Sequence, residues 1–423
     1  MRWEARAVLR KYHPKIVAVT GSVGKTSTKD AIFAVMAQSM HVRKSEKSFN
    51  SEVGLPLTIL GLENAWGNPL RWLANLLDGL FVIVFHTKYP EWLVLEVGAD
   101  RPGDISSLRG WLTTDVVVIT RLPEVPVHVE FFESPQQVVE EKASLIDTLK
   151  PGGALLLYAD DPGTLRLQER LPAPDAKILT FGFNERADIR ATDFAVVAEE
   201  GGQGWPLGMR GTVHVEGESA PVSIMGSLGA HAFLPTVAAA AVGHVLKVPV
   251  GEIVAGLGRY EAPPGRMRLL RGVKDTLIID DTYNSSPAAT LSALDTLEKI
   301  QTKGRKVAVL GDMLELGRHS VEEHRKLGAA VGRVCDLLFT VGFRAHDIAQ
   351  GALDNGMADG AILQYEDSAK AGRELQNLIK EGDCVLIKGS QSMRMERTVE
   401  EVMQEPERAG DLLVRQDAEW KKR

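Results

Sequence analysis

The sequence predicts an α/β protein in which a mostly parallel sheet with a small antiparallel appendage is followed by a second α/β domain. Short apolar runs alternate with helical segments, residues 188–225 form a glycine-rich stretch of short alternating segments, and a second alternating series follows Pro263–Gly265. Strands that alternate with helices form parallel sheets covered on both faces. The 423 residues suffice for two or three domains, each with its own core.

Apolar runs mark the strands of the first domain. We expect these strands at Lys15–Thr20, Trp92–Val97, Asp115–Thr120, Ala154–Tyr158 and Lys177–Phe181. The glycine-rich stretch after them predicts the antiparallel appendage. An alanine-rich segment, Ala230–Leu246, then predicts a long helix that closes the domain.

A similar alternation defines the second domain. Its strands are predicted at Thr276–Asp280, Lys306–Leu310, Leu337–Val341 and Cys384–Lys388. We place the boundary near Ala262, with domains at residues 1–261 and 262–423, because a Pro-Pro-Gly segment suits a stiff hinge. The charged tail, residues 404–423, is expected to be a solvated helix or disordered.

Composition excludes several classes of function. Lys and Arg number 49 against 56 Asp and Glu, a net charge of −7, which argues against nucleic-acid binding by a broad basic surface. A local basic pocket for phosphates stays open. Cys335 and Cys384 lie in apolar runs, so neither a disulfide framework nor a cysteine-rich zinc site is expected. The N-terminus is charged and lacks the apolar core of a signal peptide. Together with the low cysteine content, it predicts a cytoplasmic protein.

The most informative motif is VAVTGSVGKTSTK at residues 17–29. The strand would end at Gly21, and the backbone N–H groups of the turn up to Gly24 would face an anion at the N-terminus of the next helix. Lys25 would reach the terminal phosphates of a nucleotide, and Thr26 a magnesium ion. Only two residues separate the glycines, where the usual loop has four, so this is a variant P-loop. An ordinary strand, turn and helix is the other reading.

Further strings of this kind follow in order along the chain. Together they are TGSVGKTSTK (20–29), SFNSEVGLPLTIL (48–60), LEVGADRPGDI (95–105), HVEFFES (128–134), EKASLI (141–146), PPGRM (263–267), DDTYNSSP (280–287), LGDMLELG (310–317) and IKGSQSMRME (387–396). In these strings the chain resembles the Mur ligases, ATP-dependent amino-acid ligases of peptidoglycan synthesis, and most of all those that add D-alanyl-D-alanine. The resemblance implies a P-loop central domain and a Rossmann-like C-terminal domain.

The resemblance also implies the chemistry. Such a ligase transfers the γ-phosphoryl group of ATP to an acceptor carboxylate, and an amine then displaces phosphate from the acyl phosphate. Positioned cations supply most of the stabilisation of the transferring phosphoryl group. The residues expected to bind the nucleotide are Gly21, Ser22, Gly24, Lys25, Thr26 and Ser27, with His231, Arg266, Asp281, Tyr283 and Asn284.

Four residues are expected by resemblance to be catalytic: Lys25, Glu96, His128 and Lys142. The last three would hold Mg²⁺ together with Thr26, and two ions are expected. Lys142 would be carbamylated by CO₂, which requires a neutral amine and therefore burial or a nearby positive charge. From the residues alone, Glu96 can be a solvated turn residue, His128 a structural histidine, and Lys142 a surface lysine on a helix over residues 134–149.

Asn50, Lys388 and Ser390 are expected to contact the substrates. The acceptor would be a small molecule or a muramyl peptide, and the amine an amino acid or a dipeptide such as D-Ala-D-Ala. Asp312 and His324 also lie in matching stretches, and a structural role and a functional role stay open for both. Two alternatives to this function remain: a related ligase with a lipid-linked or glutamyl acceptor, and a nucleotide-binding scaffold with weakened catalysis.

At three places the sequence departs from the family pattern, and these departures limit how far the family's functional residues can be assigned to this chain. The P-loop begins after about twenty residues, where the family has a complete domain that binds the UDP end of the acceptor. Residues 229–235 read GAHAFLP and lack two asparagines of the family motif, so adenine would be held differently. Thr120-Arg121 stands for Thr-Asn, and Asn50-Ser51 for Asn-Asn.

The segment from Trp66 to Trp92 is apolar at helix-like spacing but is interrupted by Arg71 and Asp78. It is short for a membrane span, which needs roughly 20 apolar residues. One hypothesis is that it lies at a membrane surface or meets a lipid-linked acceptor, with tryptophans at the interface. The other is a helical hairpin that packs on the first domain or forms a dimer interface.

Overall fold

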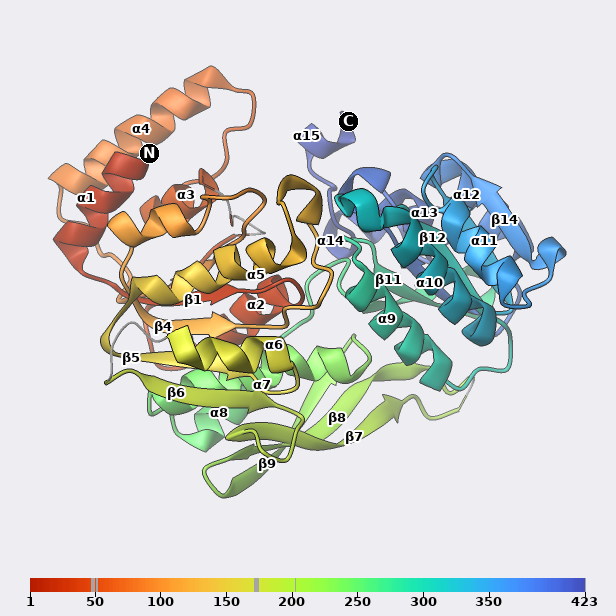
Figure 1. Ribbon diagram of the computed structural model, residues 1–423, viewed down its shortest axis with the longest axis horizontal. Coiled ribbons are helices and arrows are strands. Elements are labelled where there is room, and N and C mark those ends of the chain that lie inside the picture. The colour runs from red at the N-terminus through yellow and green to blue at the C-terminus, as the bar shows by residue number, and fades with distance from the viewer. Residues whose placement is uncertain (47–49, 51, 171–174, 202, 423) are drawn as a thin grey trace.

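The structure is a computed structural model, and it describes residues 1–46, 50, 52–170, 175–201 and 203–422; for Ala230 and His231 it describes the backbone alone. Two lobes lie side by side, the first formed by the red to green part of the chain and the second by the teal to blue part (Figure 1). Each lobe is built on one sheet.

The first lobe contains a nine-stranded sheet in the order β2-β3-β1-β4-β5-β6-β7-β8-β9. Its strands are β1 (Lys15–Thr20), β2 (Val42–Lys44), β3 (Trp92–Glu96), β4 (Thr114–Ile119), β5 (Leu149–Tyr158), β6 (Lys177–Gly182), β7 (Ile189–Ala198), β8 (Pro206–Val215) and β9 (Glu218–Met225). All neighbours from β2 to β7 are parallel, and β7, β8 and β9 are antiparallel. The five predicted strands and the antiparallel appendage are confirmed. The appendage continues the parallel sheet through β7 instead of forming a separate one.

Helices cover both faces of this sheet (Figure 1). One face carries α2 (Lys25–Met36), α7 (Ala230–Val245) and α8 (Val250–Leu257), and the other carries α1 (Arg2–Tyr12), α3 (Gly54–Leu60), α4 (Pro69–Val84), α5 (Pro135–Ala143) and α6 (Pro162–Leu165). Val17 and Val19 of β1 face the first layer, while Ile16 and Ala18 face the second. This alternation buries both sides of the strand, as a continuous apolar run requires.

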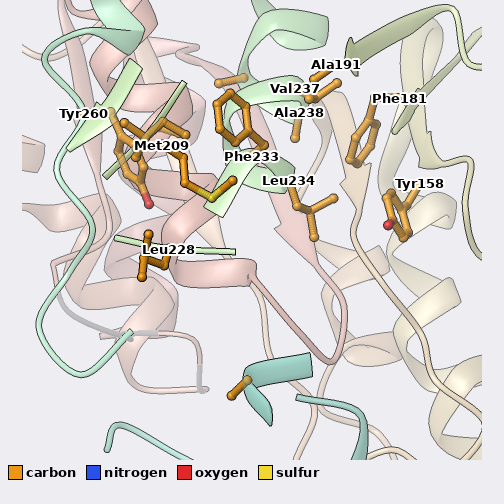
Figure 2. Close-up of a cluster of buried hydrophobic side chains, with 14 of the residues drawn as sticks. Tyr158, Phe181, Ala191, Met209, Leu228, Phe233, Leu234, Val237, Ala238 and Tyr260 are labelled. Carbon is orange, nitrogen blue, oxygen red and sulfur yellow. The ribbon is translucent and has the colours of Figure 1, made fainter. Parts of the chain in front are cut away.

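The predicted alanine-rich helix is α7, and it lies at the centre of the larger core. Figure 2 shows Phe233 and Leu234 of this helix in the same cluster as Tyr158 of β5 and Phe181 of β6. Ala238, Ala239, Ala240 and Ala241 of α7 are fully buried. Small side chains allow the backbone of α7 to lie close to α2, and this packing supports the helix that begins at the P-loop.

The second lobe contains a six-stranded sheet in the order β10-β11-β15-β12-β13-β14. Its strands are β10 (Arg268–Gly272), β11 (Thr276–Asp281), β12 (Lys306–Gly311), β13 (Leu337–Val341), β14 (Ile362–Tyr365) and β15 (Cys384–Lys388). Its helices are α9 (Pro287–Lys299), α10 (Ser320–Val334), α11 (His346–Asp354), α12 (Ser368–Leu378), α13 (Glu396–Val402), α14 (Ala409–Leu412) and α15 (Ala418–Lys421). The four predicted strands are confirmed. The sequence analysis missed β10, which is antiparallel to β11, and β14 at the other edge.

The charged C-terminal tail is folded onto the second lobe, so the prediction of a solvated or disordered tail is wrong. Leu413 is buried, and the Arg415 side chain is 4% exposed. Arg415 pairs with Glu396 at 2.8 Å and donates hydrogen bonds to the backbone oxygens of Thr282 and Tyr283. A local count of charges misses this because the partners of Arg415 lie far away in the sequence.

We expect Arg415→Met to loosen the tail and the loop at Thr282 and Tyr283. The change removes a donor from the carbonyls of Thr282 and Tyr283 and one of the two cationic partners of the buried Glu396, at about 1–3 kcal/mol in free energy of unfolding for each buried group left unsatisfied. Urea unfolding and limited proteolysis of the tail would measure it. Arg408→Met is the matched control, since Arg408 is exposed and pairs only locally with Glu405. Equal unfolding midpoints for the two variants would show that Arg415 does not anchor the tail.

Candidate active site

A cavity of about 700 Å³ lies between the lobes, at the carboxyl ends of parallel strands from both sheets. This edge is where ligands of open α/β sheets bind. The predicted site residues that line it are Ser22, Gly24, Lys25, Ser27, Asn50, Glu96, His128, Arg266, Asp281, Tyr283, Asn284, Lys388 and Ser390. Gly21, Thr26 and Lys142 lie behind this lining and touch it through the contacts described below. The side chain of His231 is outside the described part of the chain.

The P-loop turn is shaped by its glycines. Gly21 and Gly24 have φ values of 143° and 85°, which favour glycine, and a Cβ on Gly21 would lie 1.9 Å from Oγ1 of Thr120. Gly24 is the N-cap residue of α2 and has no side chain to cap the first turn. The N–H groups of the first turn of a helix suit an anion.

Lys25 begins α2 and folds back over the turn, with its Nζ donating to the backbone oxygen of Gly21 at 2.9 Å. Burial lowers the pKa of Lys25, while the nearby Glu96 carboxylate opposes this effect. Arg266 adds to the lowering and Asp100 opposes it. The ammonium group is thus held in a buried place where an anion would stabilise its charge.

Glu96 ends β3 and is 1% exposed, so the reading as a solvated turn residue is wrong. Its Oε1 accepts hydrogen bonds from Thr26 Oγ1 at 3.2 Å and Asn50 Nδ2 at 3.3 Å. Its buried Oε2 has no hydrogen-bond partner among the described residues. A carboxylate oxygen without a partner beside a hydroxyl oxygen fits Mg²⁺, which uses one or two protein carboxylates and completes its shell with phosphates and water.

Lys142 lies on α5, which begins at Pro135 and is capped by the side chain of Ser134. The side chain is 1% exposed, so the reading as a surface lysine is wrong. Its Nζ donates to Ser22 Oγ at 2.8 Å, which places Lys142 directly behind the P-loop turn. Burial lowers the pKa of Lys142 well below its ordinary value, the positive charge of Lys25 adds to this, and Asp100 opposes it. The site therefore favours a neutral amine.

His128 has a left-handed backbone, with φ of 69°, and bridges the two lobes. Its Nδ1 lies 2.7 Å from Oε2 of Glu315, and its Nε2 lies 3.5 Å from Oδ1 of Asp100. The hydrogen bond with His128 lowers the pKa of Glu315. Within the described residues no group of three or more His, Cys, Asp or Glu side chains forms a metal site. In this structure, His128 contacts the carboxylates of Glu315 and Asp100.

Arg266 connects the second lobe to the P-loop. Its guanidinium stacks 4.0 Å from the ring centroid of Tyr283, and its Nη2 lies 3.4 Å from Thr26 Oγ1. The buried Nε has no hydrogen-bond partner in the described part of the structure. A stacked guanidinium with spare donors is well suited to bind phosphate oxygens.

The loop after β11 is held by a buried ion pair. Lys388 Nζ lies 2.6 Å from Oδ2 of Asp281 and 2.8 Å from the backbone oxygen of Asn284. Burial lowers the pKa of Lys388, and Asp281 opposes this effect. Beside this pair, burial raises the pKa of Asp280 to about 6, although Thr282 donates to it. The ammonium of Lys388 is thus used largely to shape the loop that lines the cavity.

Ser390 faces the same cavity, with its Oγ accepting from the backbone N–H of Leu314. His324 is fully buried, accepts from Met313 N through Nε2 and contacts the Ser320 carbonyl through Nδ1. Asp312 accepts from the N–H of Ala345. These contacts give His324 and Asp312 structural roles in the described fold.

Several cavity residues were not predicted from the sequence, among them Asp100, Tyr260, Glu315 and Trp420. Asp100 and Glu315 lie inside two of the matching strings, 95–105 and 310–317, so those strings carried the signal. Tyr260 precedes the hinge, and burial raises its pKa despite a hydrogen bond with Ser27. Trp420 lies in the charged tail, where nothing in the local sequence indicates a site.

Two family models match the chain, the Mur ligase middle domain over residues 19–243 and the Mur ligase, glutamate ligase domain over residues 265–391. The UDP-N-acetylmuramoyl-tripeptide–D-alanyl-D-alanine ligase of Bacillus subtilis is 30% identical over 95% of this chain and 79% of the relative. The Escherichia coli enzyme of that name is 27% identical over 94% and 78%.

Solved structures agree with these matches. MurF from Thermotoga maritima, in complex with ADP, has a TM-score of 0.76 and 28% identity over 96% of this chain and 83% of its own. MurF from Acinetobacter baumannii has a TM-score of 0.77 at 24% identity over 94% and 78%, which shows the shared fold. With its middle and glutamate ligase domains in two lobes around one cavity, the chain belongs to the Mur ligase family.

Proposed function

We propose that this protein is an ATP-dependent, ADP-forming ligase of the MurF type. It would join the carboxylate of a cell-wall precursor to an amine in peptidoglycan synthesis. The observation that carries the proposal is the convergence of Lys25, Glu96 and Arg266 on one cavity between the lobes. Relatives that share up to 30% of residues over most of the chain bear the name of such a ligase.

The nucleotide would lie across the lobes. Its phosphates would meet the N-terminus of α2 and Lys25, with Arg266 reaching from the second lobe. The apolar part of the cavity wall, formed by Ile224, Leu228 and Tyr260, suits a planar base. This wall supports adenine binding without the two family asparagines.

Thr26 and Glu96 would hold one Mg²⁺, which supplies charge neutralisation at the phosphates when bound. We further propose that Lys142 is carbamylated. Its neutral Nζ would attack CO₂, form an N–C bond and release a proton, leaving a carboxylate behind the P-loop. This new anion, with His128, would serve a second ion. The support is the burial of Lys142 and its lowered pKa.

The ligation itself is a sequence of two displacements. An oxygen of the acceptor carboxylate attacks the γ-phosphorus, and ADP leaves. The amine then attacks the carbonyl carbon of the acyl phosphate, loses a proton and expels inorganic phosphate. Lys25 and Arg266 would stabilise the negative charge that moves during the first step. Because ATP is a cytoplasmic reagent, we place the reaction in the cytoplasm.

The substrates would enter near Asn50 and Ser390, which line the cavity. We propose a muramyl peptide as acceptor and D-Ala-D-Ala as amine, by analogy with the named relatives. A lipid-linked form of the acceptor is the second candidate. The exposed apolar side chains of α4, in the first lobe, favour this lipid-linked acceptor.

Phosphate release from ATP, measured against a matrix of acceptors and amines, tests the proposal. We expect release only when a muramyl tripeptide carrier and D-Ala-D-Ala are both present, with the amide product seen by mass spectrometry. ATP binding without turnover on any pair would overturn the ligase assignment. Turnover with lipid-linked but not nucleotide-linked acceptor would select the second candidate.

A further inference from the structure

Helix α4 presents its apolar face to the outside of the first lobe. The apolar side chains that are exposed there are Leu70, Leu73, Leu76, Leu77, Leu80, Phe81, Val84 and Phe85. Leu70 is 76% exposed and Val84 is 69% exposed, values typical of polar surface residues. They recur every three to four residues and therefore form one continuous stripe. A stripe of this length on a surface marks an interaction site.

The outward orientation of α4 is fixed by specific contacts with α1, beside which it lies (Figure 1). Lys11 donates to the carbonyls of Val82 and Ile83, and so satisfies the C-terminal end of α4. Gly79 faces Glu4, where any Cβ would lie 3.1 Å from the carboxylate. The Asn68 side chain caps the other end. The stripe is therefore displayed on a helix that is anchored at both ends.

Helix α1, which lies beside α4, is basic in a protein that is acidic overall. Residues 1–15 contain five Arg and Lys against a single Glu, while the whole chain carries a net charge of −7. Arg6 and Arg10 form no ion pair with any described residue. Trp3, on the same helix, is 66% exposed. We call the exposed side chains of α1 and the stripe of α4 together the α1–α4 surface.

We propose that the α1–α4 surface docks on an anionic lipid bilayer, with α4 lying in the plane of the membrane interface. An apolar stripe beside cations and an exposed tryptophan is the pattern of helices that bind such surfaces. Cations near anionic headgroups strengthen the binding. A second copy of the chain fits less well, because a symmetric contact would bring two basic α1 helices together.

Docking in this way would not require a membrane span. Among the helices of the described residues, none combines the length and the hydropathy needed to cross a bilayer. Trp66, just before α4, lies edge-on to Trp420 at 5.9 Å between ring centroids, and Trp420 lines the active-site cavity. The docked surface would thus adjoin the rim of the cavity.

Flotation with lipid vesicles tests the proposal on the full chain. We expect the protein to float with phosphatidylcholine vesicles that contain phosphatidylglycerol, and much less with pure phosphatidylcholine. The double variant L73E/L77E should bind roughly tenfold more weakly or worse. Arg6→Gln and Arg10→Gln should each weaken binding to the anionic vesicles by roughly fivefold. High salt should weaken binding of the unaltered protein.

The matched control is V321E/L378E, which places two glutamates at exposed apolar positions of the second lobe. It should float like the unaltered protein, and circular dichroism should show all variants folded. Failure of the unaltered protein to float, or equal flotation of L73E/L77E and the control, would overturn the proposal. A stable dimer in sedimentation velocity that L73E/L77E dissociates would assign the stripe to a second copy and also overturn it. Phosphate release by L73E/L77E, measured with an acceptor that is free in solution, tests the ligase function independently of membrane binding.

Discussion

Replacing Lys25 by methionine is expected to reduce kcat/KM for phosphate release by roughly 10²–10³-fold or more, the usual cost of removing a charge-stabilising donor. The Lys25 ammonium is the cation that the fold holds at the phosphate turn, 2.9 Å from the Gly21 carbonyl. Its positive charge would matter most when the γ-phosphoryl group is in transit. Steady-state phosphate release with both substrates measures the effect.

The loss should come from chemistry and not from unfolding. Burial lowers the pKa of Lys25, which means that the folded protein already disfavours its charge. Removing that charge should therefore leave the thermal midpoint unchanged or slightly higher. If Lys25→Met unfolded at a clearly lower temperature, its inactivity would say nothing about phosphoryl transfer. If it kept full activity, the role assigned to Lys25 would be wrong.

The sequence was sufficient for the elements that carry the nucleotide site. β1 and α2 follow from a β-branched run, two glycines and a lysine, all within residues 17–29. Glu96 was expected from the family resemblance, and it ends β3 at the edge where parallel strands end together. Such local patterns place a residue on an element and at one edge, and this is enough to bring Lys25 and Glu96 together.

Contacts between segments far apart in the sequence could not be predicted in this way. The pairing of His128 with Glu315 and the anchoring of Arg415 at Tyr283 join segments more than a hundred residues apart. Nothing local distinguishes Arg415 from the exposed Arg408 of the same tail. Their difference arises only when Glu396 is buried beneath one of them, and burial of a charge partner is a property of the tertiary structure.

We expect Lys142→Ala to lose ligase activity by roughly 10²-fold or more and to regain part of it in the presence of a short carboxylate such as acetate or formate. The added anion would replace the carbamate in the space that the shortened side chain leaves. Lys142→Arg is the matched control, since it fills the space, cannot be carbamylated and should not respond to the added acid. Full activity of Lys142→Ala, or equal response of both variants, would contradict the carbamate proposal.

The pH dependence gives a second readout that does not rely on activity. When unmodified, folded Lys142 has a pKa well below the ordinary 10.5. Between these two pKa values the unfolded chain binds more protons than the folded protein, so this residue makes stability rise with pH in that window. Protein freed of CO₂ should show this rise, and Lys142→Met should show less of it.

Carbamylation removes the titrating amine and places a negative charge next to Lys25. The rise in stability with pH should therefore shrink in the unaltered protein when bicarbonate is added, and Lys142→Met should not respond. Direct detection of the carbamate carbon by NMR with labelled bicarbonate should give a signal in the unaltered protein alone. Lys29 is equally buried but pairs with Asp30 at 3.3 Å. A carbamate on Lys29 instead of Lys142 would mean that burial selects the modified lysine, and not the positive charge of Lys25 beside Lys142.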